Sequence, residues 1–116
     1  EDGFGAVRVY LTADHVTPMQ LVHGGLYTAM LDVALAMTGS FRPTPEPLMP
    51  GLTLSLTTQF LSAATGDEGY LIAEARRTGG GKSVFFAAGE VLTPYRRVIA
   101  TASGVFKPGL PTKLPV

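Results

Sequence analysis

The sequence predicts an α+β fold, in which one long helix packs against an antiparallel sheet of about five strands. Residues 26–37 form an apolar stretch rich in Ala, Leu and Met, which is typical of a helix. Segments of alternating polar and apolar residues lie on either side of it, and short turn sequences join the later ones. Short turns connect antiparallel neighbours. The 116 residues fit a single domain over positions 1–116.

The first elements follow from local patterns. Residues 5–11 are β-branched and alternating, which predicts a strand. Residues 12–22 form a polar connection. Gly24-Gly25 then opens the helical stretch, and Gly39 is its expected C-terminal stop.

The second half reads as strands joined by turns. Residues 41–51 contain four prolines and predict a loop. Further strands are expected at 53–61, 70–77, 83–92 and 98–106, with a turn at 65–69 and a tight connection at 79–81. We expect one face of the second strand to carry Leu52, Leu54, Leu56 and Phe60. The tail from about 108 holds three prolines and is expected to be extended or disordered.

The composition argues against several classes of function. Nine basic and nine acidic residues cancel, so nothing points to nucleic acid or an anionic membrane as a partner. No apolar run approaches the roughly 18–20 residues of a membrane span. No signal peptide is recognisable, so the default location is the cytoplasm. Without cysteine, and with His15 and His23 as the only histidines, no metal site is expected.

The predicted helix carries a single acid, Asp32, among apolar residues on every side. Such a helix should be buried on most sides, by the sheet or by a second helix. A carboxylate in apolar surroundings is costly, and it usually pairs with a partner or titrates at a raised pKa. Groups of this kind are enriched at functional sites, although a structural Asp bonded to a loop backbone is the alternative.

The start of the helix is the second candidate feature. Gly24 and Gly25 have no side chains, so a ligand can approach the backbone there. The first N–H groups of a helix lack internal partners, and the helix dipole is positive at that end. They could polarise a carbonyl oxygen or stabilise an oxyanion. The alternative is that the glycines only allow a tight start to the helix.

The run PMQLVHGGLYTAMLD, residues 18–32, resembles the hotdog-fold thioesterases of the phenylacetic acid degradation (PaaI-like) type. That family reads Asn-x-x-Gly-x-x-His-Gly-Gly with an Asp nine residues after the His, as in His23-Gly24-Gly25 and Asp32 here. The likeness continues through PGLTLSLTTQFLSAA and GKSVFF. It implies a hotdog fold and hydrolysis of an aryl-, short- or medium-chain acyl-CoA. Coenzyme A is then part of the substrate, and no cofactor is expected.

The resemblance also assigns roles. Asp32 matches the base or nucleophile, and Gly24 the residue whose N–H polarises the thioester carbonyl. His23 matches the residue that orients this loop, and Thr53 a hydroxyl position facing the carboxylate. Thr17 stands at the family Asn and could contact the substrate. Two positions thus depart from the pattern, because Gln20 also replaces the family Gly between the Asn and the His.

A basic segment should contact the coenzyme A phosphates. Gly81, Lys82 and Ser83 match the family loop. Arg76 and Arg77 on the preceding strand are weaker candidates, because arginines beside a hairpin tip are usually solvated surface residues.

The spacing of Gly24 and Asp32 argues for a site shared between subunits. Eight positions along a helix correspond to about 12 Å, too far for one thioester to meet both. Two antiparallel helices across a two-fold axis would bring each Asp32 beside the other Gly24. We therefore expect a homodimer, and the resemblance implies that two dimers join into a tetramer.

Two alternatives stay open. A non-catalytic acyl-CoA-binding protein could keep the fold, although binding alone does not need a buried acid. A hotdog hydratase or dehydratase is the other, but neither a His-Phe-Pro nor an Asp-x-Asn-x-x-His signature is present.

Overall fold

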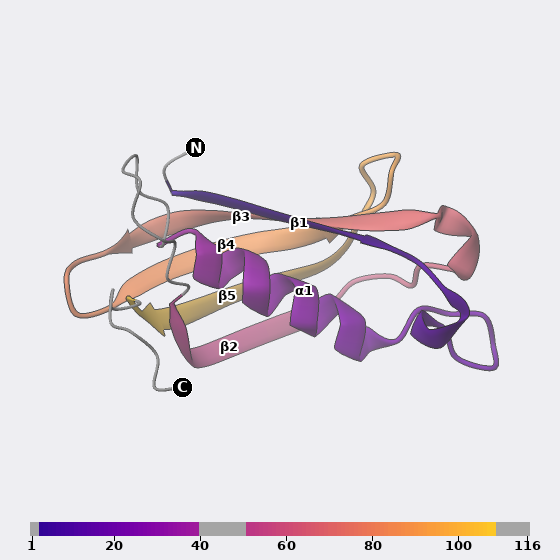
Figure 1. The fold of residues 1–116 in the computed structure, drawn as a ribbon, viewed down its shortest axis with the longest axis horizontal. Coiled ribbons are helices and arrows are strands. Elements are labelled where there is room, and N and C mark those ends of the chain that lie inside the picture. Colours follow the sequence, from indigo (N-terminus) through magenta and orange to yellow (C-terminus); the bar gives the residue numbers. More distant parts are fainter. Residues whose placement is uncertain (1–2, 40–50, 109–116) are drawn as a thin grey trace, which may run out of the picture.

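The computed structural model describes residues 3–39 and 51–108. Its elements in chain order are β1 (Phe4–Tyr10), η1 (Ala13–His15), α1 (Gly24–Met37), β2 (Leu52–Phe60), η2 (Gly66–Glu68), β3 (Tyr70–Gly80), β4 (Phe85–Leu92) and β5 (Val98–Lys107). The strands form one antiparallel sheet in the order β1-β3-β4-β5-β2, and α1 lies across one face of it (Figure 1). One helix on a five-stranded antiparallel sheet confirms the predicted α+β class.

The boundaries of α1 and of all five described strands lie within three residues of those predicted. The largest shift is in β3, which extends to Gly80, so Gly79 and Gly80 belong to the strand and only Gly81 to the connection. Gly80 has a φ of 117°, a conformation that L side chains rarely adopt. The predicted loop over 41–51 and the tail from 108 fall almost wholly outside the described residues.

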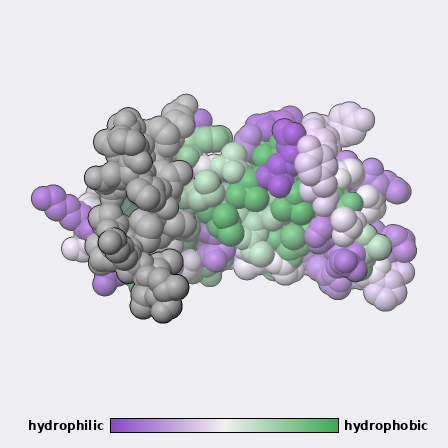
Figure 2. Space-filling model, in the orientation of Figure 1, coloured by the Kyte–Doolittle hydropathy of each residue, from purple (hydrophilic) through white to green (hydrophobic). Residues whose placement is uncertain are grey.

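The helix α1 buries one side in the sheet. The side chains of Leu31, Ala34 and Leu35 are fully buried there. The opposite side is open, because Gly25, Ala29 and Val33 are exposed at spacings of four residues. Within a single subunit the sheet covers only one side of α1, so the expected burial of α1 on most sides would need the second helix. Figure 2 shows apolar residues gathered along the middle of the face that α1 crosses.

The strand β2 lies at the edge of the sheet and contains a bulge. Thr53 pairs with Phe106 and Ser55 pairs with Val105, so the pairing with β5 shifts between Thr53 and Ser55. Phe106 is fully buried, so Thr53 shares the face of the sheet that α1 covers. A bulge adds one residue to its strand and reverses the alternation of side chains beyond it.

This bulge corrects one prediction about β2. Leu56 packs against the core, and Phe60 lies against α1, so these two do share a face. Leu52, however, pairs with the exposed Lys107 and is itself 65% exposed on the other face. Leu54 is the residue left over at the bulge. Strict alternation therefore holds for the second half of β2 and fails across Leu54.

No helix in the described part of the chain is long and apolar enough to cross a membrane.

Candidate active site

The carboxylate of Asp32 meets a hydroxyl from the edge strand. Thr53 Oγ1 donates a hydrogen bond of 2.5 Å to Asp32 Oδ1. Asp32 is half-buried on α1, and Thr53 is exposed on β2. The predicted proximity of these two residues is therefore confirmed by the geometry. The expected burial of Asp32 in apolar surroundings is not seen within one subunit, because the open side of α1 leaves its side chain partly accessible.

The start of α1 is accessible to a ligand. Gly24 is the first helical residue, and His23 before it is extended with an exposed side chain. A Cβ at Gly24 would lie 3.2 Å from Cε1 of Phe60, so this strand residue packs directly on the first turn. At Gly25 an added Cβ would meet no described atom within 4 Å. The free N–H groups of this turn thus face a surface that is apolar on one side and open on the other.

One subunit does not bring these two features together. Gly24 and Asp32 are both on the straight run of α1, about 12 Å apart along its axis. Gly24 lies against Phe60 at one end of β2, whereas Asp32 bonds Thr53 near the other end. Within a single subunit, the Asp32 carboxylate and the N–H of Gly24 are therefore separate from one another.

The segment before the helix forms a tight loop around Thr17. Thr17 Oγ1 accepts hydrogen bonds from the N–H groups of Met19, at 3.2 Å, and Leu21, at 3.4 Å. These two hydrogen bonds close the loop that contains Thr17, so its hydroxyl is already engaged within that loop. Gln20 has a φ of 64°, the left-handed region that favours glycine. Glycine, which the family has at this position, adopts that conformation without cost. Gln20 adopts it with strain.

The connection between β3 and β4 presents the predicted basic segment. Gly81, Lys82 and Ser83 are all exposed. The side chain of Arg77 donates to the carbonyl oxygens of Gly79 and Gly81, each at 3.4 Å, so it lies beside this connection. Arg77 therefore lies beside the connection that carries Lys82.

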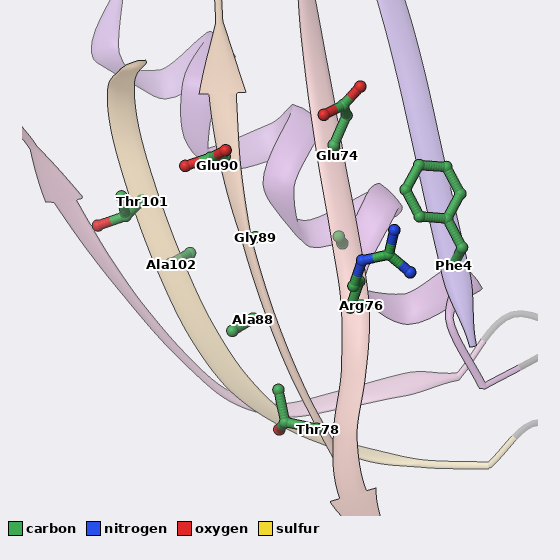
Figure 3. Close-up of a pocket in the computed structure, with 10 residues that line it drawn as sticks. Phe4, Glu74, Arg76, Thr78, Ala88, Gly89, Glu90, Thr101 and Ala102 are labelled. Atoms are coloured by element: carbon green, nitrogen blue, oxygen red, sulfur yellow. The ribbon is translucent and has the colours of Figure 1, made fainter.

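Arg76 lies on the other face of the sheet, because neighbouring residues of a strand point in opposite directions. Its guanidinium is 5.0 Å from the ring centroid of Phe4. It lines a cavity of about 470 Å³ together with Glu74 and Glu90, on the face turned away from α1 (Figure 3). Arg96 donates two hydrogen bonds of 2.9 Å to Glu74 and lowers the pKa of that carboxyl. This cavity is separated from Asp32 by the sheet.

Three further side chains lie in the core or in the loop before α1. Tyr27 is buried, and its hydroxyl accepts a hydrogen bond of 3.0 Å from the N–H of Ala64. Met30 is also buried in the core. His15 accepts a hydrogen bond of 2.9 Å from the N–H of Thr12 and lies in the loop before α1. Within residues 3–39 and 51–108, no three His, Asp or Glu side chains gather closely enough to hold a metal ion.

The sequence profile of the thioesterase superfamily matches residues 19–100, which include α1 and most of the sheet. The chain belongs to the thioesterase superfamily. The match confirms the resemblance on which the thioesterase class was expected. A comparison with curated protein sequences gave no significant match.

Solved structures agree with this membership of the thioesterase superfamily. The PaaI protein of the E. coli phenylacetic acid degradation operon is 22% identical, with a TM-score of 0.80 over 93% of this chain and 74% of that one. Zebrafish thioesterase superfamily member 2 is 17% identical, with a TM-score of 0.78 over 93% and 76%. A Bacillus halodurans protein determined with CoA is 26% identical, with a TM-score of 0.74 over 87% and 68%. These similarities confirm the hotdog fold.

Sequence reasoning missed Phe60 as a site residue. It was expected only as one of several apolar residues on a strand face. The structure places its ring against Gly24 and 6.2 Å from the ring of Tyr27. No local pattern distinguishes it from the other apolar residues of β2, because its neighbour Gly24 is 36 positions away in the chain.

Proposed function

We propose that this thioesterase hydrolyses an aryl-, short- or medium-chain acyl-CoA to the free acid and coenzyme A, with Asp32 as the catalytic carboxylate. The observation that carries the proposal is the hydrogen bond from Thr53 to Asp32 on the open side of α1. A hydroxyl bonded to one carboxylate oxygen holds the carboxylate and leaves Oδ2 available to act on the reactants. The CoA in the Bacillus halodurans relative supports this substrate class.

Asp32 could promote hydrolysis of the thioester by two routes, and both place negative charge on the carbonyl oxygen. As a general base, Asp32 takes a proton from water while the water oxygen attacks the thioester carbon. As a nucleophile, Asp32 attacks that carbon itself and forms an anhydride that water then hydrolyses. In both routes the carbonyl oxygen becomes negative, and the N–H of Gly24 stabilises it. The carbon–sulfur bond then breaks, and the thiolate leaves and is protonated as coenzyme A.

We propose that each site is shared between two subunits. The separation of about 12 Å between Gly24 and Asp32 on one helix is the first argument. The second is that β2 is an edge strand, and Thr53 and Phe60 lie near its opposite ends. A two-fold axis that pairs β2 with a second copy of β2 in antiparallel fashion places Thr53 of one subunit near Phe60 of the other. The carboxylate of one subunit then approaches Gly24 of the other.

Exposed apolar residues support the same interface. Leu52 is 65% exposed, Leu54 57% and Val33 49%, and all three lie on β2 or on the open side of α1. Exposed apolar side chains on an unpaired edge strand and on an uncovered helix side are candidates for burial in an interface. A symmetric dimer formed through β2 would bring both elements of each subunit to the same interface.

Two such dimers joined into a tetramer complete the proposed assembly. The face of the sheet turned away from α1 is the surface left open by the dimer just described. Size-exclusion chromatography with light scattering separates a monomer, dimer and tetramer. A fully active monomer would contradict the shared site.

The decisive experiment is a hydrolysis screen over aryl-, short- and medium-chain acyl-CoAs. The chain has no cysteine, so a thiol reagent detects only the released coenzyme A. Steady release of thiol beyond one equivalent supports hydrolysis. Saturable binding of acyl-CoA without release would favour a non-catalytic binding protein instead.

A further inference from the structure

The ring of Phe60 lies against the first turn of α1. A Cβ added at Gly24 would lie 3.2 to 3.7 Å from three carbons of that ring, so the ring is in close contact with the backbone of Gly24. The ring is also 6.2 Å from that of Tyr27, one turn further along the helix. Phe60 is nevertheless 57% exposed in the single subunit. It therefore contributes both a contact with the helix start and a free apolar surface beside it.

The framework around Phe60 holds the ring in this place. Phe60 pairs with Ala100 of β5. The N–H groups of Leu61 and Ser62 both donate to the carbonyl of Ile99, at 3.0 and 3.2 Å. Arg97 then donates to the Ser62 hydroxyl, which anchors the segment after the strand. The backbone position of Phe60 is thus set by the sheet, and Gly24 and Tyr27 are the neighbours of its ring.

Phe60 and Lys82 lie at opposite ends of the subunit. Added Cβ atoms at Gly39, after the end of α1, and at Gly80, at the end of β3, would both collide with Phe85. The connection that carries Lys82 therefore lies near the C-terminal end of α1, whereas Phe60 lies at its N-terminal end (Figure 1). In the shared site, coenzyme A that contacts Lys82 approaches past Asp32 of the same subunit. The acyl group then extends beyond the thioester, toward Gly24 and Phe60 of the other subunit.

We propose that Phe60 is a specificity-determining residue that limits branching at the acyl carbon next to the thioester. This rests on the proposed function. A carbonyl oxygen bonded to the Gly24 N–H lies about 2.9 Å from that nitrogen, which holds the adjacent acyl carbon near the ring. The ring edge fills the space that a substituent on that carbon would need. A straight chain passes along the ring and gains apolar contact.

The test compares kcat/KM for the best acyl-CoA of the hydrolysis screen with that for its 2-methyl derivative. The proteins are wild type, Phe60→Ala, Phe60→Leu and the control Phe86→Leu. Phe86 is 43% exposed on β4 and lies on the opposite face of the sheet. A loss of folded protein lowers both kcat/KM values equally, so their ratio reports specificity alone.

The ratio of 2-methyl to parent substrate should rise at least about tenfold in Phe60→Ala, because one methyl group in an apolar pocket discriminates by about 10- to 200-fold. Phe60→Leu should give a smaller rise, and Phe86→Leu none. An unchanged ratio in both Phe60 variants, or an equal rise in Phe86→Leu, would overturn the inference while leaving the proposed hydrolysis standing. If the wild type releases no thiol from any acyl-CoA, the proposed function fails and the inference fails with it.

Discussion

The hydroxyl of Thr53 donates a hydrogen bond of 2.5 Å to Asp32, a residue 21 positions earlier in the chain. Thr53 reaches the helix side of the sheet because β2 bulges after it, at Leu54. In a regular strand, Thr53 and Leu56 would point to opposite faces. Bulges often re-aim a side chain beside an active site, and this one places a hydroxyl on the candidate catalytic carboxylate.

Replacing Asp32 with Asn should lower turnover by roughly 10²–10⁴-fold, the usual contribution of a positioned base. The substitution keeps the shape of the side chain, so far-ultraviolet circular dichroism and the oligomeric state should be unchanged. The measurement is steady-state release of coenzyme A. Near-normal turnover in this variant would mean that Asp32 is not the catalytic carboxylate.

Thr53→Val should lower kcat about 10- to 100-fold, because a hydrogen bond to a charged group contributes about 1.5–3 kcal/mol. Thr53→Ser keeps the hydroxyl and is the matched control, which should retain most of the activity. Kinetics of the two variants side by side test the role of the hydroxyl. A loss in Thr53→Ser with little loss in Thr53→Val would show that the methyl group of Thr53, and not its hydroxyl, matters.

Gly24→Pro should remove the polarising N–H and lower kcat about 10²–10³-fold. Proline fits the first position of a helix, and His23 already has the extended conformation that precedes proline. Gly24→Ala is the control, because it adds the same Cβ beside Phe60 but keeps the N–H. If both variants lose activity equally, the loss comes from crowding against the ring.

The shared site predicts complementation. Co-expressed subunits carrying Asp32→Asn and Gly24→Pro, with different tags, should form hybrids that regain partial activity, because each hybrid contains one site with both residues intact. Purified hybrids without activity, from subunits that fold, would place the whole site in one subunit.

Lys82→Ala should raise KM for acyl-CoA at low ionic strength, and the effect should shrink at high salt because exposed charges are screened. Arg8→Ala removes the same charge from an exposed residue of β1 and should leave KM unchanged. The measurement is KM at two salt concentrations for each variant. Unchanged KM in Lys82→Ala at low salt would make Lys82 a solvated surface residue.

Gln20→Gly should raise the free energy of unfolding by up to about 1 kcal/mol. Glycine removes the strain of the left-handed conformation, about 1–2 kcal/mol, but it increases the entropy of the unfolded chain. Denaturant unfolding measures the change. Gln20→Ala should give no gain, because alanine keeps a Cβ at the same φ. A loss of stability in Gln20→Gly would show that the Gln side chain makes a stabilising contact.

The sequence by itself determined the fold class, the order of the elements and the candidate carboxylate. These depend on local signals: the apolar stretch of α1, the alternation in each strand and the glycines and prolines between them. The opposite directions of Arg76 and Arg77 also follow from the period of a strand, so that separation was available from the sequence.

Only the tertiary structure decided which side chains meet. The bulge at Leu54 depends on the register between β2 and β5, which no single segment specifies, and it determines that Thr53 faces Asp32. The contact of Phe60 with Gly24 likewise depends on how the helix lies across the sheet. Periodicity is a property of a segment, whereas pairing register and helix placement result from the packing of the whole core, so the contacts of Thr53 with Asp32 and of Phe60 with Gly24 became visible only in three dimensions.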